Sequence, residues 1–447
     1  MTELRILASR WIVTPRGVVD GGIVIEGERI AAVVARAELP AGLDVEDVGD
    51  LAILPGAVDP HVHLNEPGRA DWEGFETGTR AAAAGGITTL IDMPLNSRPA
   101  TVSVEALRQK EAAAAGKLAV DVGFHGGMVP GNLEELEPLF DAGVFAFKAF
   151  LAPSGVDEFP AVGARELRPV MEILTRRGAV LMAHAEIESP VATAGDPRAY
   201  AAWLAARPDR FETEAHRLLV ELVRETGCEL HVVHLATSDG IPALREARRE
   251  GLPVTIETCP HYLTFAAEEI PDADPRFKCA PPMRAARHRE GLWQALVAGH
   301  LDFVASDHSP APPDRKTEDL LASWGGIASL QLALPATWTG ARKRDLSLRD
   351  LARWTATAPA RRFGLASRKG SIAPGQDADL VVLDPDATFE VVGAELCHRH
   401  PQTAYEGRRL HGIVYRTLVR GRTVYDRSEG FATPGGRVVR RIEPRPR

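Results

Sequence analysis

Short apolar runs alternate with longer amphipathic stretches along most of the chain, from about residue 55 to residue 310. Each apolar run is rich in Val, Ile, Phe and Ala, and ends in a cluster of Gly, Pro, Asp or Asn. Short apolar runs bounded by turn residues are typical of buried strands. We predict eight such strands, at 57–63, 86–94, 119–128, 144–150, 179–186, 229–236, 253–260 and 303–310.

The stretches between these strands have the spacing of apolar residues that predicts helices. The clearest of the predicted helices are 71–84, 104–115, 166–177, 212–226, 241–249 and 285–298. Eight strand–helix repeats favour the α/β class and, within it, a (β/α)8 TIM-like barrel. A doubly wound open sheet stays open as an alternative, to be decided by strand count and site geometry.

Both ends of the chain follow a different pattern from the middle. Residues 1–54 and 370–447 read as short strands joined by turns, and neither piece is large enough for a stable domain of its own. We therefore predict that the two ends pair into one small β-domain beside a barrel that spans residues 55–369.

Composition narrows the class of protein. The chain has 447 residues, 45% of them hydrophobic, which is enough for a large core. A net charge of −9 and the absence of a Lys/Arg stripe argue against nucleic-acid binding. The four cysteines form no CxxC pair, and the sequence contains no signal peptide pattern and no apolar run of membrane-spanning length. We expect a reduced, soluble, cytoplasmic protein that acts on a small molecule and binds no membrane.

Histidines occur where the predicted strands end, which is where a barrel places its active residues. His61 and His63 are two residues apart on the first strand, so both rings face one side and can reach one ion. His184 ends the fifth strand. On the sixth strand His231 and His234 face opposite sides, and His234 is the better candidate because it lies nearer the carboxyl end.

Two further charged residues share these positions. Asp307, near the end of the eighth strand, is a candidate metal ligand and general base. Lys148 interrupts the apolar fourth strand, where an unpaired ammonium is costly. Taken alone, Lys148 could place its amine at the end of the strand in solvent. Its place among the other strand-end residues indicates a different role for Lys148. A neutral lysine amine reacts with carbon dioxide to give a carbamate, and a carbamate can bridge two divalent metals.

The sequence resembles the cyclic amidohydrolases, most closely the allantoinases among them. The resemblance covers nearly the whole length and is carried by "PGAVDPHVHLNEPGR", "WEGFETGTRAAAAGGITTLIDMPLNS", "FKAFLAPSGVDEFP", "ETCPHYL", "KCAPPMR", "SDHSP" and "APGQDADLVVLD". It implies a (β/α)8 barrel with a small β-sandwich built from both termini, and a homotetramer. It also implies two divalent ions, zinc with manganese or cobalt as alternatives, and a carboxylated Lys148. The implied ligands are His61 and His63 for one metal, His184 and His234 for the other, Lys148 as the bridge and Asp307 on the first metal.

Enzymes that catalyse several different reactions share this fold and these metal ligands. In dihydroorotases an arginine that binds the substrate carboxylate follows two residues after the HxH pair, and here that position is Asn65. Hydantoinases and dihydropyrimidinases carry a tyrosine after the bridging lysine, and the stretch "FLAPSG" has none. Allantoin has only a hydantoin ring and a neutral ureido arm, which suits an amide better than a guanidinium.

The resemblance thus implies metal-dependent hydrolysis of the ring amide of allantoin to allantoate, with Asp307 as proton shuttle. It also suggests Asn96, Cys279 and Ser309 as residues that line the substrate pocket. The alternatives are a related ring-opening enzyme for hydantoins, dihydropyrimidines or dihydroorotate, and a non-catalytic scaffold on the same fold. A scaffold predicts missing ligands, and all six are present.

Overall fold

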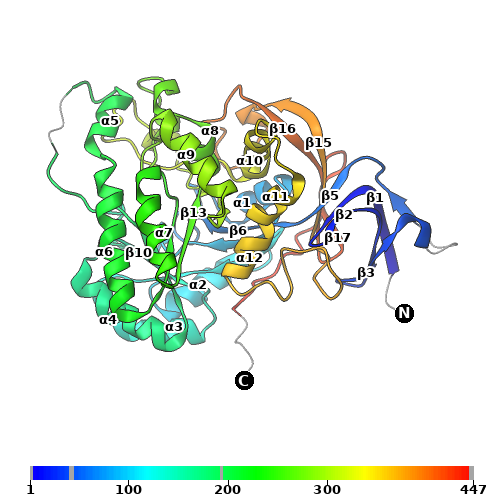
Figure 1. Ribbon diagram of the computed structural model, residues 1–447, viewed down its shortest axis with the longest axis horizontal. Coiled ribbons are helices and arrows are strands. Elements are labelled where there is room, and N and C mark those ends of the chain that lie inside the picture. The colour runs from blue at the N-terminus through cyan, green and yellow to red at the C-terminus, as the bar shows by residue number, and fades with distance from the viewer. Residues whose placement is uncertain (1–3, 40–44, 192–194, 442–447) are drawn as a thin grey trace.

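A computed structural model gives the three-dimensional structure of the chain. It describes residues 4–39, 45–191 and 195–441. Residues 1–3, 40–44 and 442–447 of the predicted terminal domain lie outside the described residues. A barrel of strands ringed by helices forms the larger part, and a sheet of N-terminal and C-terminal strands lies at one side of it (Figure 1).

The barrel strands are parallel and follow one another in chain order. They are β6 (Ala57–Val62), β7 (Ile87–Asp92), β8 (Asp121–Phe124), β9 (Gly126–Gly127), β10 (Phe147–Phe150), β11 (Val180–His184), β12 (Glu229–Val232), β13 (Val254–Thr258) and β14 (Phe303–Val304). The predicted third strand is divided into β8 and β9, which are separated by His125. Val62 pairs in parallel with His308, just beyond β14, and this bridge brings the last barrel strand beside the first. The predicted (β/α)8 barrel is confirmed.

Helices follow most of the barrel strands and cover the outside of the barrel (Figure 1). They are α1 (Phe75–Ala84), α2 (Val104–Ala114), α3 (Leu136–Asp141), α4 (Ala164–Arg177), α5 (Tyr200–Ala206), α6 (Arg210–Thr226), α7 (Ile241–Arg249), α8 (Pro260–Thr264), α9 (Ala286–Val297), α10 (Ala333–Arg342), α11 (Leu348–Ala352) and α12 (Ala358–Arg362).

Two of these helices show how the sequence sets their bounds. Helix α4 buries Leu167, Met171 and Leu174 on one stripe against the strands, and it ends at Gly178, whose φ of 61° suits a residue without a side chain. Helix α1 begins later than the predicted residue 71, at Phe75, because Gly74 has a φ of 134° that a helix cannot contain.

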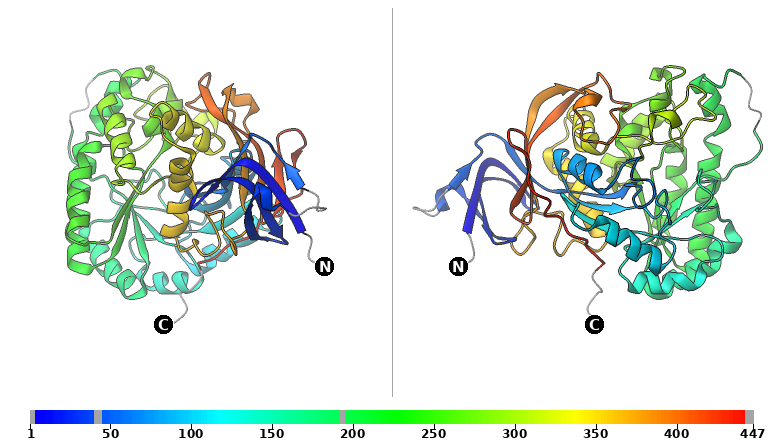
Figure 2. Two further views of the ribbon diagram at one scale, coloured as in Figure 1. Left: turned by 45° about the vertical axis from the view of Figure 1, so that its right-hand side comes forward. Right: turned by 180° about the vertical axis from the view of Figure 1, so that it is seen from behind.

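Strands from both ends of the chain form one sheet beside the barrel (Figure 2). The N-terminal strands are β1 (Leu4–Thr14), β2 (Gly17–Glu26), β3 (Arg29–Ala35), β4 (Val45–Asp47) and β5 (Ala52–Pro55), and the C-terminal strands are β15 (Leu380–Glu390), β16 (Arg409–Val419), β17 (Arg422–Asp426) and β18 (Gly430–Phe431). Strand β5 joins the two sets, because it pairs in parallel with β1 and antiparallel with β15. The small β-sandwich built from both termini is therefore confirmed.

The sandwich and the end of the chain are tied to the barrel by specific contacts. The Lys369 ammonium lies 2.7 Å from a carboxylate oxygen of Asp121 in β8 and 2.7 Å from one of Asp379, just before β15. Near the C-terminus, Val438 pairs in parallel with Val122 of β8. The division of the chain at residues 54 and 369 stays a prediction. Within the described ranges, every helix is too short or too polar to cross a lipid bilayer.

Candidate metal centre and substrate cavity

The first pair of predicted ligands meets Asp307 at the carboxyl end of the barrel strands. His61 lies at the end of β6 and its Nε2 atom is 3.2 Å from Oδ1 of Asp307. Nε2 of His63, which follows β6, is 3.5 Å from the same oxygen. All three residues are buried. The strand spacing that placed both rings on one side therefore brings two nitrogens and one carboxylate to a single point.

The second pair adjoins the first. Nδ1 of His184 lies 3.0 Å from Nε2 of His234. The ring centroids of His61 and His234 are 5.4 Å apart, so the two pairs form one continuous cluster. His231, by contrast, points away from it. It contacts Glu257 and Thr255 and stacks on Phe303, as its position on the opposite face of β12 predicts.

Lys148 lies within β10 and is fully buried. Its Nζ atom has no hydrogen-bond partner among the described residues, and it lies 5.0 Å from the centre of the Phe150 ring. Burial lowers the pKa of Lys148 to about 8. The alternative of an amine that reaches solvent is therefore wrong, because this amine faces the interior.

The chemistry of these atoms fits a divalent metal. Ligand atoms of His61, His234 and Asp307 lie within 4.8 Å of one another. Nδ1 of His234 and Nζ of Lys148 are buried polar atoms without partners in the described structure, and such atoms are costly unless something binds them. Burial also lowers the pKa of His61 and of His234 well below the usual value, which keeps both imidazoles neutral, as metal binding requires.

Carboxylates behind the histidines hold the rings in place. Glu257, fully buried on β13, contacts Nδ1 of His61 with one oxygen, and its other oxygen is 3.0 Å from Nε2 of His231. Glu186 lies 2.9 Å from Nε2 of His184 and accepts from Arg207 at 2.7 Å. Such partners fix the tautomer and the orientation of a metal-binding histidine. The sequence analysis missed both glutamates, although a charged Glu257 in a buried strand is the same signal that singled out Lys148.

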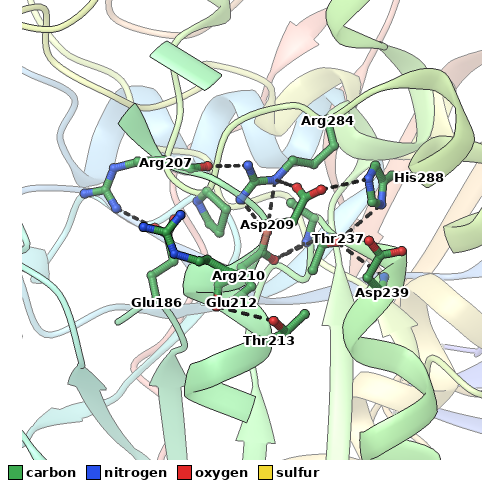
Figure 3. Close-up of polar contacts among 12 residues, drawn as sticks. Glu186, Arg207, Asp209, Arg210, Glu212, Thr213, Thr237, Asp239, Arg284 and His288 are labelled. Atoms are coloured by element: carbon green, nitrogen blue, oxygen red, sulfur yellow. Dashed lines mark hydrogen bonds and ion pairs between the residues drawn. The ribbon is translucent and has the colours of Figure 1, made fainter. Parts of the chain in front are cut away.

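A buried ion-pair network extends from Arg207 to the chain that follows His234 (Figure 3). Arg284 donates to the backbone carbonyl of Arg207 and pairs with Glu212 at 2.8 Å. The other oxygen of Glu212 accepts from the backbone N–H groups of Ala236 and Thr237, at 3.0 and 3.1 Å. The network therefore connects the supports of His184 and His234.

Two other groups in the described part of the chain have a ligand-like composition. Asp209, Asp239 and His288 lie close together (Figure 3), but arginines already neutralise their carboxylates: Arg284 pairs with Asp209 and Arg287 with Asp239. Cys259 and His261 also have ligand atoms near Asp307, so this group shares Asp307 with the main cluster. The histidine cluster is accordingly the best candidate for a metal centre.

A cavity of about 620 Å³ opens onto this cluster. The three residues suggested as substrate contacts, Asn96, Cys279 and Ser309, all line it. The Cys279 thiol donates to the carbonyl of Pro281 at 3.2 Å. Asn65 is not among the lining residues. It is buried and has a φ of 64°, a conformation that asparagine tolerates better than most residues.

Unusual backbone conformations gather at the same place. Asn96, His234 and Asp307 have φ values of 69°, 39° and 45°, in a region that residues with side chains rarely adopt. Such conformations persist where the surrounding structure holds them, and they concentrate at functional sites. The cavity, the cluster and the strained backbone thus coincide.

Comparisons with known proteins agree with this geometry. A family model described as "Amidohydrolase family" matches residues 52–424. The chain is 49% identical to an allantoinase from Streptomyces avermitilis over 98% of both chains, and 44% identical to an allantoinase from Arabidopsis thaliana over 94% of this chain and 87% of that one. Among solved structures, an L-hydantoinase (dihydropyrimidinase) from Arthrobacter aurescens superposes with a TM-score of 0.93 at 32% identity, over 99% of this chain and 100% of that one. The chain belongs to the amidohydrolase family and, within it, to the cyclic amidohydrolases that include the allantoinases.

Proposed function

We propose that the protein hydrolyses the ring amide of allantoin to give allantoate. The observation that carries this proposal is the 49% identity to an allantoinase over 98% of both chains. The cluster of His61, His63, Lys148 and Asp307 at the edge of the cavity supports it, because ring-amide hydrolysis requires an activated water and a proton shuttle.

We assign the metal-binding roles from the family resemblance, and the closeness of His61, His234 and Asp307 supports a metal centre at this place. His61 and His63 would hold one ion together with Asp307, and His184 and His234 would hold the second. Lys148, carboxylated by carbon dioxide, would bridge the two ions, which we propose are zinc. When bound, two divalent ions supply Lewis acidity, which acidifies water toward neutral pH and polarises the amide carbonyl.

The protein's own side chains perform the remaining steps. Asp307 lies against both His61 and His63, so its carboxylate is placed to accept a proton from the attacking water and to return it to the leaving ring nitrogen. Asn96, Cys279 and Ser309 line the cavity and are placed to orient the hydantoin ring. The half-enclosed cavity also limits the access of bulk water to the reacting carbonyl.

A hydantoinase or dihydropyrimidinase activity is the second candidate. The observation that favours it is the superposition on the Arthrobacter aurescens L-hydantoinase with a TM-score of 0.93. The 49% sequence identity to an allantoinase favours the first candidate over it, because that value exceeds the 32% identity to the hydantoinase. The family resemblance is also the support for our further proposals of a homotetramer, of a cytoplasmic location and of domain limits at residues 54 and 369.

One comparison of substrates tests the assignment. The purified chain, loaded with zinc or manganese, is assayed for kcat/KM on allantoin, hydantoin, dihydrouracil and dihydroorotate. We expect allantoin to be opened most efficiently, and dihydroorotate at least about 100-fold less so, because Asn65 stands where dihydroorotases have the arginine that binds the substrate carboxylate. If hydantoin or dihydroorotate matches allantoin, the allantoinase assignment is wrong and only the cyclic amidohydrolase assignment remains.

A further inference from the structure

One wall of the cavity carries positive charge outside the proposed metal cluster. Lys278, Trp203 and Arg207 line this wall together. The Lys278 ammonium lies 4.4 Å from the centre of the Trp203 ring, and the Arg207 guanidinium lies 5.4 Å from it. Two cations therefore share one aromatic side chain at the surface where substrate would lie.

The two cations differ in how their charges are balanced. Arg207 pairs with two carboxylates, with Glu186 at 2.7 Å and with Glu188 at 2.9 Å (Figure 3 shows the Glu186 side). Lys278 forms no ion pair with any described residue and donates only to the backbone carbonyls of Leu321 and Ser323. An ammonium has three N–H donors, so one donor of Lys278 is not used by these bonds.

A buried cation without an ion-pair partner is costly, and Lys278, which is only 5% exposed, has two backbone carbonyls and the Trp203 ring as its contacts. Burial, and then the neighbouring charge of Arg207, lower the pKa of Lys278 to about 8. A ligand with a strong hydrogen-bond acceptor, bound in the cavity, would offset the cost of burying the Lys278 ammonium and would raise its pKa. This wall is therefore suited to a ligand that carries a carbonyl oxygen or another acceptor beyond the reacting ring.

We propose that Lys278 forms a subsite for the ureido arm of the substrate, with its ammonium donating to the carbonyl oxygen of that arm. The inference rests on the proposed function, because it takes allantoin as the substrate. It makes Lys278 a specificity determinant: the interaction is available to a hydantoin ring that bears a ureido group and unavailable to plain hydantoin.

The hydrogen bonds of Lys278 are also consistent with a purely structural role, and the experiment has to distinguish that role from substrate binding. Leu321 and Ser323 belong to a loop that forms part of the cavity lining, so Lys278 also holds this loop. Lys316 holds the same loop through the carbonyl of Gly326, at 2.7 Å, but it does not line the cavity. Lys316→Met is therefore a matched control that removes a loop contact without removing a side chain that lines the cavity.

The experiment compares wild type, Lys278→Met, Lys278→Arg and Lys316→Met, each loaded with zinc and checked for metal content and melting temperature. Two quantities are measured: kcat/KM for allantoin, and the inhibition constant of hydantoin as a competitor. For Lys278→Met we expect kcat/KM for allantoin to fall about 10- to 100-fold, the effect of losing one charge-assisted hydrogen bond, while the hydantoin constant stays within about twofold. Lys278→Arg should recover part of the loss, because it keeps a cationic donor.

Several outcomes would overturn the inference. Equal weakening of allantoin and hydantoin in Lys278→Met would assign the residue to the loop alone. A loss in Lys316→Met that is selective for allantoin would assign the selectivity to the loop and not to the Lys278 ammonium. Unchanged kinetics on allantoin would show that the ammonium does not contact the substrate. A wild-type chain that leaves allantoin intact would refute the proposed function itself, and that result is visible before any variant is compared.

Discussion

Glu257→Gln is the change that most directly tests the organisation of the metal centre. Glu257 is fully buried, and its two oxygens serve the rings of His61 and His231. Its first oxygen also accepts from the backbone N–H of His234 at 3.3 Å. Glutamine keeps the shape of the side chain but has one acceptor oxygen and no charge, so one of the two rings then faces an amide N–H and has to change its tautomer.

The size of the effect follows from the two ring contacts. A hydrogen bond to a charged group contributes about 1.5–3 kcal/mol, and a neutral one about 1 kcal/mol. Replacing both bonds therefore removes about 1–4 kcal/mol in total, of which about half falls on His61. At 1.4 kcal/mol for each factor of ten, this share lowers the affinity for the ion held by His61 by about 10-fold. Losses of about 10- to 100-fold are typical for partners of metal-binding histidines.

Metal affinity is measured by competition with a chelator, and kcat/KM is measured at limiting and at saturating metal. Asp121→Asn serves as a control, because Asp121 is equally buried and charged but lies at the opposite end of the barrel, paired with Lys369. We expect the control to lower the melting temperature and to leave the metal affinity unchanged. Glu257→Gln with a metal affinity and kcat/KM within twofold of wild type would refute the claim that Glu257 organises the site.

Three further changes test other parts of the argument. Lys148→Ala should lose metal and activity, and a short added carboxylic acid should restore part of both; two ions per chain and a full rate would contradict the bridging role. Asp307→Asn should lower kcat by about 100- to 10,000-fold while part of the metal is kept, and a rate within a few-fold of wild type would assign proton transfer to another group. Lys369→Met leaves Asp379 buried without its cation and leaves Asp121 with Arg420 alone, so urea unfolding should show a loss of about 3–5 kcal/mol in stability. Unchanged stability would show that this ion-pair cluster is not needed for folding.

The barrel and the metal-ligand cluster could both be predicted because they depend on local patterns. Strand position follows from apolar runs and turn residues, and the face of each residue follows from the period of two along a strand. Placing active residues at the carboxyl ends of barrel strands then brought His61, His184 and Asp307 together before any distance was known. His231 and His234 illustrate the same logic, because the position of His234 nearer the carboxyl end of the sixth strand selected it as the ring in the cluster.

The supporting residues could not be predicted in the same way, because their roles depend on contacts between distant segments. Arg207 follows α5, yet its guanidinium reaches Glu186 beyond β11. Lys278 is separated by more than forty residues from the loop carbonyls that it binds. Asn65 shows the opposite error. Its place in the sequence suggested a wall of the substrate pocket, whereas the structure buries it outside the cavity lining in a left-handed conformation.

Buried polar groups at the two ends of the barrel differ in whether they have partners. This difference identifies the functional end of the barrel from the structure alone. At one end Lys369, Arg420 and Asp121 satisfy one another through direct ion pairs. At the other end the Lys148 amine and one ring nitrogen of His234 have no partner within the described structure. Unsatisfied buried polar atoms are costly, so an amine and an imidazole nitrogen without partners beside a cavity are the atoms that bound ligands would complete. The same reasoning applies to the substrate. Lys278 is a buried cation on the same cavity, and one of its N–H donors has no acceptor in these hydrogen bonds.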